Sequence, residues 1–141
     1  MTFYLDTSAL VAATTNEAKT SAVQQWLHGK TAGDLAISDW VITEYSAALS
    51  IKLREKQLDI AARGAAAALF ASLCTNNLNI LQVSGTHFRI AARFADQHTL
   101  GLRSGDALHL AVAADHGLML CTLDKRQFGA GPALSVQTKL L

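Results

Sequence analysis

The sequence has few of the residues that mark domain boundaries or covalent cross-links. Its 141 residues include a single proline, Pro132, and no serine- or glycine-rich linker, so we expect one domain spanning residues 1–141. The two cysteines, Cys74 and Cys121, lie far apart in the chain and form no metal-spaced pair. We expect both to be reduced and buried in the core.

Long apolar runs and a basic leader are also missing. Charged residues such as Arg63, Arg93 and Asp115 interrupt the longest apolar stretches, which excludes a membrane-spanning helix. The first ten residues, MTFYLDTSAL, contain no basic side chain and reach an aspartate at position 6, unlike a signal peptide. We therefore expect a cytoplasmic protein with no membrane partner.

Neither sign of charge is in large excess, because the formal net charge is +1. A general polyanion binder would be strongly basic, so any contact with nucleic acid must depend on a local basic patch. What the chain does have is apolar residues, which make up 50% of it and are rich in alanine. This composition predicts a well-formed core with closely packed helices.

Short strand-like and helix-like segments alternate along the chain. The apolar patterns predict strands near 2–5, 35–37, 79–83, 118–122 and 133–137. Helices are expected near 7–15, 17–29, 39–56, 59–74, 86–99 and 104–116, with Thr7 or Ser8 capping the first and Ser38 or Asp39 the third. This alternation predicts an α/β fold, a mostly parallel central sheet of about four to five strands with helices on both faces.

Four acidic residues stand at positions where a charge needs an explanation. Asp6 follows the first expected strand and Asp124 follows the strand near 118–122, and the carboxyl ends of parallel strands are where ligands bind. Glu44 and Asp106 lie within otherwise apolar helices, where a charge is costly unless something compensates it. We therefore expect the four carboxylates to converge on one cation, although each alone would more often be a surface charge or a helix cap.

The chemistry of such a cluster favours one type of ion. Without a cation, like-charge repulsion would raise at least one carboxyl pKa. Oxygen ligands alone favour Mg²⁺ or Mn²⁺ over zinc, which prefers histidine and cysteine. An ion of this kind lowers the pKa of a bound water and neutralises charge on a phosphodiester. The cluster thus predicts phosphodiester hydrolysis.

The sequence resembles a known family in four successive segments. Residues 4–10 (YLDTSAL), 37–45 with Ile37-Ser38 and Thr43-Glu44-Tyr45, 105–111 (GDALHLA) and 120–124 (LCTLD) resemble the ordered motifs of PIN-domain ribonucleases, in particular VapC-type toxins of bacterial toxin–antitoxin pairs. The resemblance implies a single PIN domain, Mg²⁺ or Mn²⁺ dependence and endonucleolytic cleavage of RNA that blocks translation. It also implies a homodimer and a cognate antitoxin that inhibits the enzyme.

The resemblance carries particular roles onto this chain. It implies that Asp6, Glu44, Asp106 and Asp124 form the catalytic site, with Asp6, Asp106 and Asp124 as metal ligands. Asp6 and Asp106 are the first choices for direct contact, whereas Glu44 and Asp124 can act through water. Ser8 and Thr122 are expected to support the site by hydrogen bonds to carboxylates or water.

Several other side chains are candidates for contacts near this site. His109 lies three residues after Asp106, on the same helical face, and we expect it to be a structural partner of the acids rather than a catalytic base. Lys125, Arg126 and Arg103 are the expected RNA contacts. Trp26 and Trp40 are at helical spacing from apolar neighbours, so packing is expected rather than base stacking.

Other functions fit the same class of fold less well. A receiver domain needs an acidic pair after its first strand, a haloacid-dehalogenase-like phosphatase needs a second aspartate at position 8, and a dinucleotide-binding module needs a glycine-rich turn there. The segment Asp6-Thr7-Ser8-Ala9 supplies none of these. The alternative that stays open is a non-catalytic partner-binding domain that retains the PIN fold.

The expected antitoxin needs a surface on which to bind. The helices near 7–29 and 39–56 are expected to offer a groove for an amphipathic segment of this partner. The side chains expected to be shielded there are Leu10, Val11, Trp26, Ile42 and Leu49.

Overall fold

The structure is a computed structural model that describes all 141 residues. A five-stranded sheet with the strand order β3-β2-β1-β4-β5 forms its centre, and every neighbouring pair of strands is parallel. The strands are β1 (Phe3–Leu5), β2 (Leu35–Ser38), β3 (Asn79–Leu81), β4 (Met119–Thr122) and β5 (Thr138–Leu140). The expected α/β class with a parallel sheet is confirmed.

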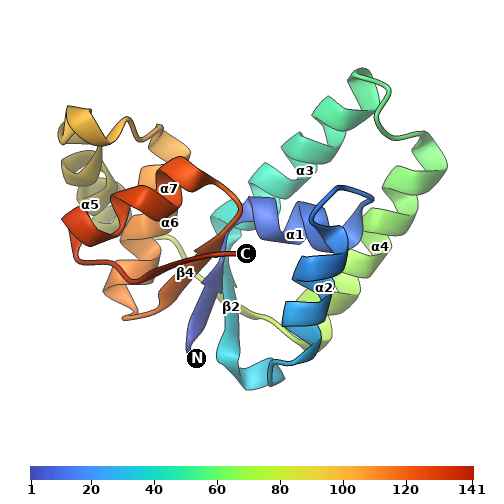
Figure 1. The fold of residues 1–141 in the computed structure, drawn as a ribbon, viewed down its shortest axis with the longest axis horizontal. Coiled ribbons are helices and arrows are strands. Elements are labelled where there is room, and N and C mark those ends of the chain that lie inside the picture. The colour runs from blue at the N-terminus through green and yellow to red at the C-terminus, as the bar shows by residue number, and fades with distance from the viewer.

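Seven helices flank the sheet. They are α1 (Thr7–Thr14), α2 (Thr20–His28), α3 (Asp39–Arg54), α4 (Ile60–Asn76), α5 (Gly85–Asp96), α6 (Ser104–Asp115) and α7 (Lys125–Ala130). Helices α1 to α4 lie on one side of the sheet and α5 to α7 on the other, with α3 and α4 extending outward as a hairpin (Figure 1). None of these helices has the length and apolar character needed to cross a membrane.

The central strands are buried because helices cover both of their faces. Tyr4, Leu5, Ile37 and Leu120 are inaccessible to solvent, and β2 is buried at all four of its positions. Continuous burial of this kind explains why the strands read as apolar runs rather than as an alternating pattern.

The connections between strands place a ligand-binding position beside β1. From β1 the chain proceeds outward through β2 to β3, and then returns to form β4 on the other side of β1. The carboxyl ends of β1 and β4 therefore flank the point where the strand order reverses, which is where open parallel sheets bind ligands. Asp6 follows β1 directly, and Asp124 follows β4 by two residues.

The end of the chain departs from the sequence prediction. The strand expected at 133–137 is wrong, because a 3₁₀ turn (Pro132–Leu134) occupies this region and β5 begins only at Thr138. Pro132 starts the turn, and Ser135 has a positive φ of 57°, so the chain bends before it can pair. Helix α7 was not expected, since its six residues are too few to reveal a helical period.

One helix cap differs from expectation, and a second has the expected residue but no side-chain capping bond. The N-cap of α1 is Asp6, whose carboxylate accepts a hydrogen bond from the Ala9 amide, and not Thr7 or Ser8. Ser38 does stand at the N-cap of α3, but its hydroxyl makes no capping bond and instead contacts the Tyr4 hydroxyl at 2.7 Å. In both places a buried contact between strands and helices decides the role of the side chain.

The return from α7 to β5 depends on a glycine that has no room for a side chain. A Cβ at Gly131 would lie 2.4 Å from Thr138 Cγ2 and 2.7 Å from the Val136 carbonyl oxygen. We expect Gly131→Ala to lower the free energy of unfolding by about 1–3 kcal/mol, the usual cost of overpacking. Gly129→Ala is the control, because nothing lies within 4 Å of its Cβ position inside α7. Equal thermal unfolding midpoints for the two variants would contradict this packing.

Candidate active site

Asp6 is the most deeply buried of the four acids, with 4% of its surface exposed. Its Oδ1 accepts hydrogen bonds from Ser8 Oγ at 2.6 Å and from the Ala9 amide at 3.1 Å, and its Oδ2 accepts one from Thr122 Oγ1. Ser8 and Thr122, the two hydroxyl residues singled out in the sequence, therefore both bind this carboxylate. The contacts join the ends of β1 and β4.

Asp124 lies beside Asp6 in this network and begins α7. Its Oδ1 accepts hydrogen bonds from the backbone amides of Arg126 at 2.8 Å and Gln127 at 3.1 Å. Its own amide donates to Thr122 Oγ1 at 2.9 Å. The side chain is exposed, and Oδ2 is left free of protein donors.

Glu44 reaches the site from α3 and is half-buried. Its Oε1 accepts hydrogen bonds from Thr7 Oγ1 at 2.7 Å and from His109 Nε2. Its Oε2 faces Gly105, where an added Cβ would lie only 2.9 Å away. A glycine directly before Asp106 thus leaves room for the Glu44 carboxylate beside the first turn of α6.

Asp106 occupies the first turn of α6 and is half-buried. No other side chain donates a hydrogen bond to its carboxylate, while its backbone carbonyl accepts one from Gln127 Nε2 at 3.2 Å. Of the four acids it therefore has the carboxylate with the fewest protein partners. Its one protein donor is the backbone of Arg103, so most of the carboxylate remains available to a ligand.

The pKa values of Asp6 and Asp106 are both raised above the ordinary value of an aspartate. Burial raises the pKa of Asp6, although His109, Ser8, Thr122 and the Ala9 amide act in the opposite direction. The pKa of Asp106 is also raised, first by burial and then by repulsion from the carboxylates of Asp124 and Asp6. Asp6, Asp106 and Asp124 are thus close enough to act on one another electrically.

Glu44 shows the reverse behaviour. Burial on its own would raise its pKa, but the hydrogen bonds from His109 and Thr7, with the attraction of His109, lower it below its ordinary value. The donors around Glu44 outweigh the effect of its burial, whereas those around Asp6 do not, and Asp106 has few donors. A cation between the aspartates would supply what they lack.

The donor set fits a hard divalent ion. All the free atoms are carboxylate oxygens, the ligands that Mg²⁺ and Mn²⁺ prefer. No three of the four acids have carboxylate oxygens that all lie within 4.8 Å of one another. An ion here would therefore contact one or two carboxylates directly and reach the others through water, as Mg²⁺ commonly does. One other group of three potential metal ligands in the chain does meet this distance.

That other group consists of His87, Asp115 and His116. It lies at the opposite end of α6 from Asp106, about 14 Å away along a helix that rises 1.5 Å per residue. His87 Nδ1 accepts a hydrogen bond from the Ser84 amide at 3.0 Å, so its Nε2 carries the proton that it donates to Asp115 Oδ2 at 2.9 Å. Because both nitrogens of His87 are engaged, this residue ties α5 to α6 and has no lone pair left for a metal.

Gln127 belongs to the site, although nothing in the sequence pointed to it. It is fully buried. Its Nε2 donates to the Asp106 carbonyl, and its Oε1 lies 3.2 Å from Thr122 Oγ1. Gln127 therefore joins α7, α6 and β4 behind the acids. Gln127 could have been found in the sequence only if the short helix α7 after Asp124 had been predicted.

The remaining expected residues are placed as follows. Lys125 and Arg103 are exposed near the acids in sequence, whereas Arg126 Nη1 donates to the Gly101 carbonyl at 3.3 Å. Trp26 packs edge-on against Phe3, and Trp40 is half-buried beside Gly105 with an indole N–H that has no partner.

The two cysteines differ in their burial. Both thiols are free, as expected; Cys121 is buried, while Cys74 is only half-buried. Cys74 lies near the C-terminal end of α4, where one face of the helix remains open to solvent, so the expectation of full burial is wrong for this residue.

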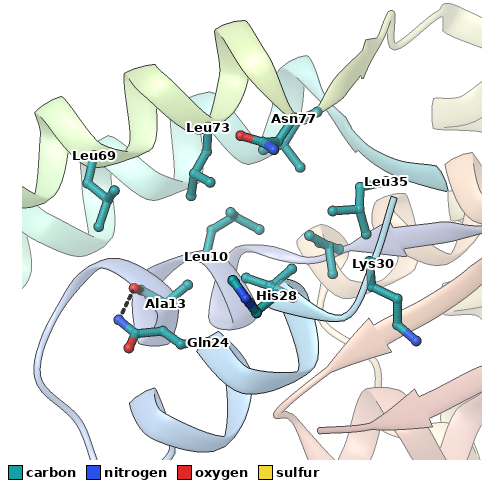
Figure 2. A pocket seen from close by; sticks show the side chains of 12 residues that line it. Leu10, Ala13, Gln24, His28, Lys30, Leu35, Leu69, Leu73 and Asn77 are labelled. Carbon is teal, nitrogen blue, oxygen red and sulfur yellow. Dashed lines mark hydrogen bonds between the residues drawn. The ribbon is translucent and has the colours of Figure 1, made fainter. Parts of the chain in front are cut away.

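A pocket of about 320 Å³ lies beside the sheet, between α1, α2 and α4. Leu69 and Leu73 of α4 face Leu10 of α1 across it, and Gln24 is held by a hydrogen bond to the Ala13 carbonyl (Figure 2). Helix α4, rather than the expected α3, forms the second wall. The apolar side chains of α3, Val41, Tyr45 and Leu49, are already buried in the core.

Only one of the five residues expected to be shielded by a partner lines this pocket, namely Leu10. Val11 and Leu49 are core residues, and Trp26 and Ile42 pack against that core from its edge. Leu10, Val11 and Leu49 are buried within the fold, whereas Trp26 and Ile42 are half-buried, so contact of a partner with those two residues stays a prediction. The sequence indicated apolar faces correctly but could not say which of them the fold leaves open.

Comparisons with known proteins agree with this architecture. The PIN domain family matches residues 3–131, so the chain belongs to the PIN domain family. Mycobacterium tuberculosis VapC20, described as a sarcin–ricin-loop-cleaving toxin, is similar in structure at a TM-score of 0.72 and 20% identity, over 92% of this chain and 95% of that one.

Two further solved structures are similar. A Pyrobaculum aerophilum protein has a TM-score of 0.70 and 24% identity, over 92% of this chain and 86% of that one. Rickettsia felis VapBC2, solved with a DNA fragment from its promoter, has a TM-score of 0.68 and 18% identity, over 100% and 99%. No curated protein matches the chain. At such identities the likeness concerns the fold.

The raised aspartate pKa values predict how stability depends on pH. A carboxyl whose pKa is higher in the folded protein takes up its proton there first, so metal-free protein should become more stable as pH falls from above the raised values of Asp6 and Asp106. The lowered pKa of Glu44 has the opposite effect on stability, but only below the ordinary glutamate pKa of 4.5. We expect thermal unfolding midpoints in EDTA to rise as the pH is lowered toward 5.

A variant isolates the contribution of one carboxylate. Asp106→Asn should unfold at a higher temperature than wild type in EDTA, and its gain at lower pH should be smaller, because one repelling charge is gone. Asp39→Asn, on an exposed residue, is the control. If Asp106→Asn and Asp39→Asn unfold alike at every pH, the carboxylates do not interact.

Proposed function

We propose that this protein is a Mg²⁺- or Mn²⁺-dependent endoribonuclease and the toxin of a toxin–antitoxin pair that blocks translation. The observation that carries the proposal is the meeting of Asp6, Asp106 and Asp124 at the point where the strand order reverses, with Asp6 and Asp106 short of positive charge. Membership of the PIN family supports it, as does the fold shared with an RNA-cleaving toxin.

The residues divide the work of the site among themselves. When bound, a divalent cation supplies a water of lowered pKa and neutralises charge on the scissile phosphate. Asp6 and Asp106 are the proposed direct ligands, since the pKa of each is raised and a cation would stabilise its charged form. Asp124 and Glu44 use their free oxygens to orient the attacking water. Ser8 and Thr122 keep the Asp6 carboxylate fixed.

RNA would reach the acids over a small basic area. Lys125 directly follows Asp124, and Arg103 precedes the first turn of α6; both are exposed. Arg126 is a weaker candidate, because its guanidinium is tied to the Gly101 carbonyl. With a net charge of only +1, binding depends on these few contacts and should weaken as salt rises.

The antitoxin is proposed to bind the pocket between α1, α2 and α4. A Klebsiella pneumoniae structure of similar fold is described as a toxin–antitoxin complex. Here eight of twelve lining residues are hydrophobic, with Lys30 and His28 among the others, so an amphipathic segment with an acidic residue would fit. We also propose a homodimer, on the family resemblance alone.

The activity is tested by removing one ligand. We expect Asp106→Asn to reduce the rate of RNA cleavage by several orders of magnitude while the protein stays folded, because a metal ligand contributes several kcal/mol to the transition state. Cleavage by wild type should require Mn²⁺ or Mg²⁺ and stop with EDTA, and Asp39→Asn should retain it. A folded wild type that cleaves no RNA with either metal would favour the non-catalytic domain that retains the PIN fold.

Two leucine-sized side chains of equal exposure test the partner surface. Leu69 lines the pocket and Ile51 of α3 does not, yet each is 45% exposed. Leu69→Glu should weaken binding of the co-encoded antitoxin at least tenfold in calorimetric titration, since a charge would enter an apolar contact. Ile51→Glu should leave it unchanged. Equal effects of the two substitutions would place the partner elsewhere.

A further inference from the structure

We infer that His109 is a positioning residue that fixes the orientation of Glu44, and that a buried chain of hydroxyl groups from Tyr4 and Ser38 in turn fixes His109. The inference rests on the proposed function of the acidic site. It assigns to His109 no contact with substrate or metal. The three residues that it involves, His109, Tyr4 and Ser38, are all buried.

Glu44 and the three residues behind it come from four different elements. His109 lies on α6 with 2% of its surface exposed, and both Tyr4 of β1 and Ser38 at the end of β2 are fully buried. Tyr4 Oη is 2.8 Å from His109 Nδ1 and 2.7 Å from Ser38 Oγ. The other ring nitrogen, Nε2, bonds Glu44 Oε1. A continuous hydrogen-bonded chain thus runs from the sheet to the site.

The direction of each hydrogen bond follows from the groups available. An ionised Glu44 can only accept, so the proton of His109 is on Nε2. A neutral ring accepts at Nδ1 from the Tyr4 hydroxyl, which then accepts from Ser38, whereas a protonated ring donates to the Tyr4 oxygen and the Tyr4 hydroxyl donates to Ser38. Burial raises the pKa of Tyr4 far above its ordinary value, so the phenol keeps the proton that this arrangement needs. Every donor in the chain has one acceptor.

This arrangement controls which oxygen of Glu44 is available. Thr7 and His109 both donate to Oε1, which leaves Oε2 beside Gly105 as the oxygen free to face the site. The spacing of three residues places His109 on the same face of α6 as Asp106. Without His109, the Thr7 hydroxyl would be the one remaining donor to Glu44. A single hydrogen bond would not prevent rotation of the Glu44 carboxylate.

Two substitutions at position 109 separate positioning from simple filling of space. His109→Gln can place its amide nitrogen where Nε2 lies and so keep the donor to Glu44. His109→Asn is shorter, reaches only the position of Nδ1, and loses that donor. We expect the Asn variant to lower kcat for RNA cleavage by about 10- to 100-fold, the effect of losing a hydrogen bond to a charged group. KM should change little, and the Gln variant should recover most of kcat.

A spectroscopic measurement tests the same chain without any assay of activity. In ¹⁵N NMR of the metal-free wild type, His109 should carry a proton on Nε2, the nitrogen that bonds Glu44. Tyr4→Phe removes the hydrogen-bond partner of Nδ1 and should shift the Nδ1 resonance, while Nε2 keeps its proton because the bond to Glu44 remains. A wild-type ring protonated on Nδ1 alone would overturn the inference.

The failures of the two proposals can be told apart. If wild type cleaves RNA but the Asn and Gln variants have equal kcat while both remain folded by thermal unfolding, His109 does not position Glu44, and the proposed function stands. If wild type cleaves no RNA but the ¹⁵N resonances behave as expected, the hydrogen-bonded chain is correct and the proposed function is wrong.

Discussion

The carboxylate of Asp6 is buried at the end of the central strand, and the elements around it are arranged to satisfy it. A charge in this position is tolerated only with hydrogen-bond donors, which come from the first turn of α1 and from the end of β4. The same donors hold the two loops together, because Ser8 also accepts from the Leu123 amide. The junction of β1 and β4, and with it the site, depends on this one buried group.

Three of the four acids lie at the start of helices as well as at the candidate site. Asp6 and Asp124 cap α1 and α7, and Asp106 lies in the first turn of α6. The partial positive charge at a helix N-terminus favours a carboxylate, which offsets part of the repulsion among them. Repulsion and burial still leave the pKa values of Asp6 and Asp106 raised. The fold therefore holds these acids together at a cost that a cation would remove.

The acids could be predicted because their signals are local: a charge at the end of a strand or within an apolar helix is visible in a short stretch of sequence. The supporting residues could not. Gln127 acts on Asp106, and Tyr4 acts on His109, through contacts between residues far apart in the chain, and Gly105 matters only because Glu44 lies against it. The misplaced last strand and the open pocket between α1 and α4 likewise depend on tertiary packing, which periodicity does not report.

The claim that these acids share a cation is tested most directly by a crystal structure of the wild-type protein grown with Mn²⁺ and measured near the manganese absorption edge. The account predicts an anomalous peak in contact with a carboxylate oxygen of Asp6 or Asp106, with Asp124 and Glu44 bonded to its water ligands. A peak at His87, Asp115 and His116 with none between the aspartates would contradict it.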